Sequence, residues 1–151
     1  MRKFVFIWMV CLNCFSISLT YGQEALLGSG KITRADGMAS YFIIGSFFTR
    51  EKCEKNVHWL IGEIISKAKW VGQNLSSQIN PCLARFAENS KYELLYRELD
   101  SVHYVLFHES IRLMIVHPQG ILSEEKAVCE KIQEGFDKLL HIHSKCIAPK
   151  G

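Results

Sequence analysis

The stretch from Cys53 to Cys82 constrains the fold more than any other part of the chain. Its apolar residues keep helical spacing for about eight turns. The positions that step by three and four along it are Val57, Leu60, Ile64, Ala68, Val71, Leu75 and the polar Gln78. Such a helix needs partner helices, because its apolar stripe is unstable in water. The spacing therefore predicts a central helix from Arg50 to about Ile79.

Two further long helices are predicted downstream. Ser90 and Glu93 form a capping box, and the apolar stripe behind it stops before Pro118. Ser123 is placed to cap a last helix. The stripe of that helix consists of Val128, Ile132, Phe136, Leu139 and His143.

A short apolar helix is predicted from Met38 to Phe48, ahead of the central helix. This segment is apolar on nearly every side, so a buried strand would show a similar pattern. We favour the helix because the chain downstream has helical patterns and a single strand would have no partner. Residues 23–32 show no sustained period and are interpreted as a flexible N-terminal arm. The predicted fold of residues 33–151 is all-α: a small bundle of three long helices plus the short N-terminal helix, cross-linked by two disulfides.

Residues 1–22 have the pattern of a secretory signal peptide. Arg2 and Lys3 precede an uncharged apolar run from Phe4 to Leu19, and small residues favour cleavage after Gly22. The alternative is an uncleaved membrane anchor, although the run is short for a bilayer span. We expect no stable membrane span after cleavage.

The chain beyond the signal peptide is close to neutral. The full sequence has 18 basic and 15 acidic residues, and cleavage would remove two basic ones to leave a net charge of +1. Charges of both signs are interleaved and form no basic stripe. This pattern excludes a nucleic-acid binder.

Four of the six cysteines lie beyond the signal peptide, at Cys53, Cys82, Cys129 and Cys146. An even number in an exported chain of this size indicates two disulfides, whereas a metal site would need close pairs. The ends of a straight helix from Cys53 to Cys82 would be about 40 Å apart, too far for a disulfide. Three helices running up, down and up predict bonds between Cys53 and Cys129 and between Cys82 and Cys146.

The intervals between these cysteines are similar to those of insect odorant-binding proteins that retain four of the usual six. The resemblance covers the spacing alone, so no functional residue is carried over to this chain. A bond between Cys53 and Cys82 would favour the arrangement of that family.

No catalytic or metal-binding motif is found. The spacings of five between His103 and His108 and of two between His141 and His143 put neither pair on one helix face. A Gly-x-Ser-x-Gly elbow is also missing from the sequence. We therefore expect no enzyme activity, no metal and no cofactor.

Aromatic residues are more numerous than a helical core of this length requires. Their simplest role is to fill the core, and the alternative is that some line a pocket or a patch for a partner. The residues predicted to bind a ligand or partner are Tyr41, Phe42, Phe47, Phe48 and Trp59.

These patterns favour a secreted or periplasmic, disulfide-stabilised helical protein that binds another protein, as an effector, inhibitor or accessory subunit does. The alternative is a carrier of a small hydrophobic ligand, and a secreted enzyme is the third hypothesis. Asn74 begins a glycosylation sequon, which matters if the source is eukaryotic.

Overall fold

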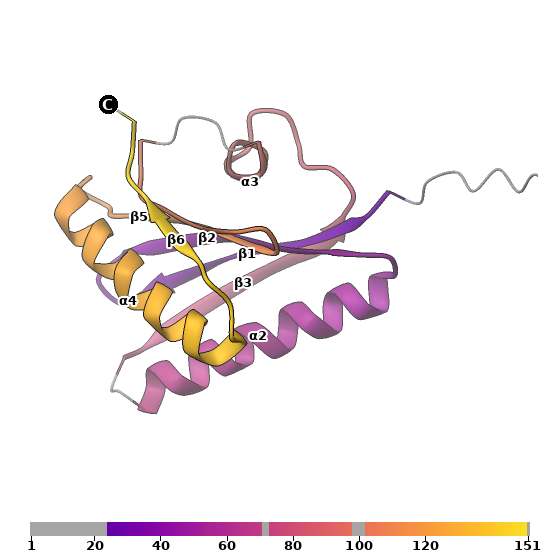
Figure 1. Ribbon diagram of the computed structural model, residues 1–151, viewed down its shortest axis with the longest axis horizontal. Coiled ribbons are helices and arrows are strands. Elements are labelled where there is room, and N and C mark those ends of the chain that lie inside the picture. Colours follow the sequence, from indigo (N-terminus) through magenta and orange to yellow (C-terminus); the bar gives the residue numbers. More distant parts are fainter. Residues whose placement is uncertain (1–23, 71–72, 98–101, 151) are drawn as a thin grey trace, which may run out of the picture.

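The computed structural model describes residues 24–70, 73–97 and 102–150, so the predicted signal peptide lies outside the described residues. One antiparallel sheet of six strands, in the order β3-β1-β2-β5-β4-β6, organises this part of the chain (Figure 1). The elements in chain order are β1 (Leu26–Arg34), β2 (Ala39–Phe47), α2 (Arg50–Trp70), β3 (Leu75–Leu83), α3 (Lys91–Tyr96), β4 (Val105–His108), β5 (Ile111–Val116), α4 (Leu122–Leu140) and β6 (Lys145–Ile147).

The sheet carries helices on both faces. Phe42 and Ile44 of β2 pack with residues of α2 and α4, whereas Tyr41 and Ile43 pack with residues of α3 on the other face. Successive residues of a strand point to opposite faces, so a strand covered on both sides shows no polar alternation. The segment Met38–Phe48 is therefore largely the buried strand β2, and the prediction of a short helix there is wrong.

The partner that β2 requires is β1, which includes most of the segment interpreted as a flexible arm. Glycines in β1 allow its neighbours to approach closely. A Cβ on Gly30 would lie 2.3 Å from the backbone oxygen of Gln78 and 2.6 Å from the Phe42 ring. A Cβ on Gly28 would lie 2.1 Å from a methyl group of Val57. The glycines that suggested flexibility are thus required by tight packing.

The predicted all-α bundle is wrong because the central helix is shorter than the stretch of sequence with helical spacing. α2 ends at Trp70, and the chain returns as β3 at one edge of the sheet. Pro81 lies in this edge strand, next to a register shift opposite Leu27 and Ser29 of β1. Edge strands and bulges tolerate proline because its missing N–H does not break a central ladder.

The second long helix is replaced by a short helix and a hairpin. The cap at Ser90 is confirmed, since the backbone N–H of Glu93 donates to Ser90 Oγ at 3.1 Å. The return bond of the predicted capping box differs, because the Glu93 carboxylate accepts from the backbone N–H of Asn89 and that of Ser90 donates to the Ala87 carbonyl. The helix α3 then ends at Tyr96. β4 and β5 then pair as antiparallel strands. The last predicted helix is confirmed as α4, although it begins without a side-chain cap, so Ser123 does not have the predicted role.

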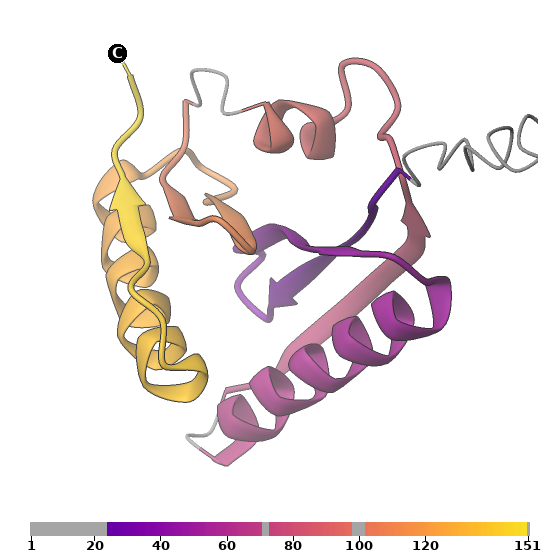
Figure 2. The ribbon, with the colours of Figure 1, turned by 45° about the vertical axis from the view of Figure 1, so that its right-hand side comes forward.

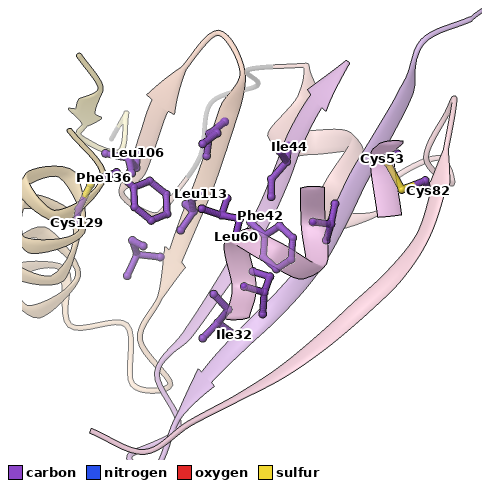
Figure 3. Packing of buried hydrophobic residues seen from close by; sticks show 14 of the residues in the cluster. Ile32, Phe42, Ile44, Cys53, Leu60, Cys82, Leu106, Leu113, Cys129 and Phe136 are labelled. Carbon is purple, nitrogen blue, oxygen red and sulfur yellow. A yellow bond between two sulfur atoms is a disulfide. The ribbon is translucent and has the colours of Figure 1, made fainter. Parts of the chain in front are cut away.

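The main hydrophobic core lies between the sheet and the two long helices α2 and α4 (Figure 3). Phe42 of β2 is at its centre and is only 2% exposed. The fully or almost fully buried residues around it include Val57 and Leu60 of α2, Leu106 of β4, Leu113 and Ile115 of β5, and Phe136 of α4. Both helices are therefore held to the same face of the sheet.

Two disulfides are present, as predicted, but their pairing differs from the prediction. Cys53 is bonded to Cys82 and Cys129 to Cys146, with Cα atoms 6.3 and 6.0 Å apart. Each bond joins a helix to the strand that folds back along it: α2 to β3, and α4 to β6. The predicted pairing assumed unbroken helices, and it fails because both segments reverse direction. The bond between Cys53 and Cys82 occurs in a sheet-rich fold, so it gives no support to a helical odorant-binding arrangement.

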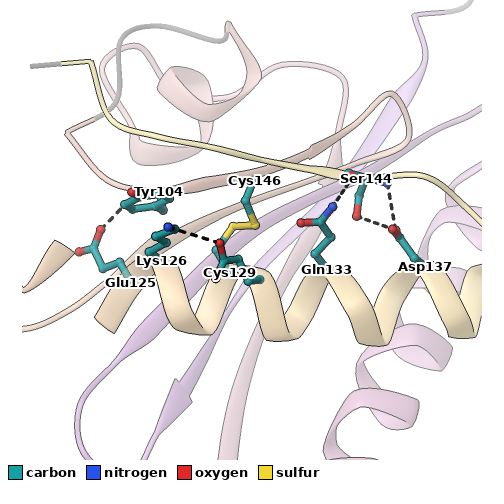
Figure 4. The surroundings of a disulfide bond; sticks show 9 residues. Tyr104, Glu125, Lys126, Cys129, Gln133, Asp137, Ser144 and Cys146 are labelled. Carbon is teal, nitrogen blue, oxygen red and sulfur yellow. Dashed lines mark hydrogen bonds and ion pairs between the residues drawn. A yellow bond between two sulfur atoms is a disulfide. The ribbon is translucent and has the colours of Figure 1, made fainter. Parts of the chain in front are cut away.

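A buried carboxylate fixes the loops next to the start of α4. Glu125 is 0% exposed, and its oxygens accept hydrogen bonds from the backbone N–H groups of Tyr104 and His117 at 3.2 and 2.9 Å. His103 Nδ1 lies 2.9 Å from the same carboxylate. The chain entering β4, the end of β5 and the helix α4 are thereby held at one point. Figure 4 shows the contact between Glu125 and Tyr104.

We expect Glu125→Gln to lower the free energy of unfolding by about 2–3 kcal/mol, because an amide nitrogen would face one of these buried donors. The matched control is Glu124→Gln, which alters an exposed carboxylate that contacts His117 Nε2 at 3.1 Å and should cost less than about 1 kcal/mol. Urea unfolding of both variants measures the difference. Equal losses would contradict a structural role for the buried carboxylate.

The C-terminal segment is held to α4 by polar contacts as well as by Cys129–Cys146 (Figure 4). The backbone N–H and the hydroxyl of Ser144 both donate to Asp137 Oδ1, at 2.9 and 2.7 Å, and Gln133 Nε2 donates to the Ser144 carbonyl at 2.7 Å. The backbone hydrogen bond from Ser144 holds the pKa of Asp137 below its ordinary value. These contacts fix the turn that brings β6 back along α4.

Candidate functional site

A cavity of about 380 Å³ opens between α2, α4 and the sheet. Residues of β1, β2, β3 and β5 form its floor, and the facing sides of α2 and α4 form its two walls. The apolar lining residues are Ile32, Met38, Ile64, Leu75, Leu113, Val128, Ile132, Phe136 and Leu139, together with Gly135. The polar lining residues are Arg34, Ser40, Lys67, Gln73 and Lys131.

The arrangement of the helices accounts for this space. α2 and α4 lie on the same face of the sheet but are inclined to each other (Figure 2). α2 contacts β1, β2 and β3, whereas α4 contacts β4, β5 and β6, so the helices cover different halves of the sheet. The cavity lies between these two halves, where residues of both helices line it.

A glycine in the wall of α4 enlarges the cavity. Gly135 lies next to the buried Phe136, and a Cβ built on it would meet no atom within 4 Å. Glycine inside a helix costs about 1 kcal/mol relative to alanine. Stability therefore gives no reason for a glycine at this position, and a larger side chain here would take up part of the cavity.

The charged groups on the cavity lining are all basic. Arg34 is ion-paired with Asp36 at 2.6 Å, and its Nη1 also approaches the Met38 sulfur at 3.9 Å. Lys67 comes from the α2 wall and Lys131 from the α4 wall. Neither lysine forms an ion pair with another residue in the described part of the chain. Two ammonium groups without carboxylate partners therefore flank an apolar space.

The five aromatic residues predicted to bind a ligand or partner are dispersed, and none of them lines the cavity. Phe42 belongs to the core, and the partly buried Phe47 packs against it. Tyr41 lies on the other face of the sheet, where its ring is 5.9 Å from that of Tyr92. Phe48 and Trp59 are 69% and 53% exposed. A role for these two exposed side chains in partner binding stays a prediction.

The sequence does not identify the cavity residues as a site, although several belong to its apolar stripes. Ile64 of α2 and four apolar residues of α4, namely Val128, Ile132, Phe136 and Leu139, are predicted to face partner helices. Part of each stripe faces the cavity instead. The sequence feature that could have indicated the cavity is Gly135 within the apolar stripe of α4, with Lys131 one turn before it.

Histidine and carboxylate side chains in the described ranges do not form a metal site. Groups of three or more His, Cys, Asp or Glu residues with suitable geometry are not found there. The contact of His103 with Glu125 is part of the attachment of loops to the start of α4. Within the same residues, no helix has the length and hydrophobicity that a bilayer span needs.

Comparisons with known proteins do not assign the chain to a family. No protein-family model matches it, and neither a curated protein nor a solved structure shows significant similarity. The cavity and its lining are therefore the features from which a function can be inferred.

Proposed function

We propose that this protein binds a small, predominantly apolar ligand in the cavity between α2 and α4. The observation that supports the proposal is the cavity itself, with a volume of about 380 Å³ and a largely aliphatic lining. Ligand sites in proteins are typically about 300–1,000 Å³ and mostly apolar, with a few polar groups that orient the ligand. Between the two predicted binding functions, this geometry favours a carrier of a hydrophobic molecule over a protein-interaction module.

We also propose that the protein acts outside the cytoplasm, in a secreted or periplasmic location. Two disulfides are compatible with an extracellular compartment, and the sequence of residues 1–22 predicts export. A carrier in such a compartment would keep an apolar molecule away from water.

Binding of another protein is the second candidate, and one observation favours it. Phe48 and Trp59 expose large apolar side chains, which are enriched in partner interfaces. Extraction of the purified protein with organic solvent, followed by mass spectrometry, separates the two functions. A carrier should release a bound hydrophobic compound, whereas an interaction module should release none.

The cavity is tested by filling it from Gly135. We expect Gly135→Trp to weaken binding of a hydrophobic fluorescent probe at least about 10-fold, because the indole would occupy space that the ligand needs. Folding should be preserved, since an added Cβ meets no atom within 4 Å and a non-glycine residue favours the helix. Fluorescence titration gives the affinity and thermal melting checks the fold.

Gly62→Trp is the matched control. Gly62 is also a helical glycine whose added Cβ meets nothing within 4 Å, but it lies on α2 outside the cavity lining. This variant should bind the probe as the wild type does. If both tryptophan variants bound the probe with wild-type affinity, the cavity would not be the binding site.

A further inference from the structure

We infer that the ligand is a single-chain amphiphile with an anionic head group, and that Lys67 and Lys131 hold this head at the cavity mouth. The inference rests on the proposed binding function and adds the chemical class of the ligand. The acyl chain would lie along the aliphatic lining, and the head would remain near water between the two lysines.

Charge complementarity supports an anionic head. All three charged residues of the lining are cations, and none is a carboxylate. Arg34 already has Asp36 as its partner at 2.6 Å, which leaves Lys67 and Lys131 as the cations that a ligand can neutralise. A cationic head group would meet like charges there and no counter-charge.

The positions of the two lysines indicate that the head group lies at the cavity mouth. They are contributed by opposite walls, and both residues are exposed although they contribute to the lining. Lysine side chains commonly lay their methylene stems on apolar surface and keep the ammonium group in water. An anion between them would therefore be held from two sides at the mouth, while the chain occupies the interior.

Head-group preference is measured with four ligands that share a twelve-carbon chain: dodecanoate, dodecyl phosphate, dodecanol and dodecylammonium. Isothermal titration below the micelle concentration gives each affinity. We expect both anions to bind about 10-fold more tightly than dodecanol, as two partly solvated ion pairs would provide, and dodecylammonium to bind most weakly. The comparison of the two anions distinguishes a carboxylate head from a phosphate head.

The double variant Lys67→Gln/Lys131→Gln should remove the preference for anions, so that dodecanoate and dodecyl phosphate bind no more tightly than dodecanol does. The control is Lys55→Gln/Lys126→Gln, which also removes one charge from each helix but at exposed positions outside the lining. This control should retain the preference. Higher salt should weaken binding of the anions more than binding of dodecanol, because it screens the ion pairs.

The outcomes separate this inference from the proposed function. Equal binding of all four ligands would overturn the anionic head group and leave the apolar cavity as a binding site. The same conclusion would follow if the control variant Lys55→Gln/Lys126→Gln reduced anion binding as much as Lys67→Gln/Lys131→Gln does. If none of the four ligands bound, the proposed function would fail, and this inference with it.

Discussion

Reduction of both disulfides is expected to lower the free energy of unfolding by about 7 kcal/mol. The bonds close loops with sequence separations of 29 and 17 residues, and restriction of the unfolded chain gives about 4 and 3 kcal/mol for loops of these lengths. Domains of this size are typically stable by only about 5–15 kcal/mol. Loss of about 7 kcal/mol would therefore remove about half or more of this stability, and the reduced protein should melt at a much lower temperature.

Circular dichroism melting with and without a reductant that does not absorb in the far ultraviolet measures this effect. Replacing the cysteines pair by pair with alanine apportions it, and loss of Cys53–Cys82 should cost slightly more because its loop is longer. Non-reducing peptide mapping should recover Cys53 joined to Cys82 and Cys129 joined to Cys146. Identical melting curves in both conditions would show that the bonds do not stabilise the fold.

Phe42→Ala is expected to cost about 4 kcal/mol, more than the loss of the buried Glu125 carboxylate. The Phe42 ring is 2% exposed, at the centre of the core between the sheet and the helices (Figure 3). Removal of a buried phenylalanine ring loses its transfer free energy and leaves a cavity that neighbouring residues fill only in part. The melting temperature should fall by roughly 15 °C.

Phe48→Ala is the control for this prediction, because the same side chain is removed from a position that is 69% exposed. It should change stability by less than about 0.5 kcal/mol. Thermal and urea unfolding of both variants give the comparison. A similar loss at both positions would contradict the assignment of Phe42 to the core and Phe48 to the surface.

The sequence predicted the local features of the helices better than the sheet. The cap at Ser90, the helix α4 and the presence of two disulfides could be read from residues close together in the chain. The strands depend on partners that are distant in sequence. β1 pairs with β3 across more than 40 positions, so nothing near Gly30 indicates its neighbour.

Helical spacing from Leu75 to Gln78 was misleading for a physical reason. β3 is an edge strand, and most of its side chains face solvent or are only partly buried. It therefore lacks the strict alternation of a half-buried strand, and its few apolar residues happen to continue the period of α2. The cavity could not be predicted from the sequence either, because an apolar stripe has the same pattern whether it faces a core or an empty space.

Both disulfides also fasten the outermost strands of the sheet. Cys82 ties β3 to α2 at one edge, and Cys146 ties β6 to α4 at the other. A detached edge strand exposes backbone donors and acceptors, which allows other copies to add to the sheet and begin ordered aggregates. In this fold neither edge can detach without moving the helix bonded to it. The covalent links that stabilise the monomer therefore also keep β1 and β4 paired, so that these inner strands are not exposed as new edges.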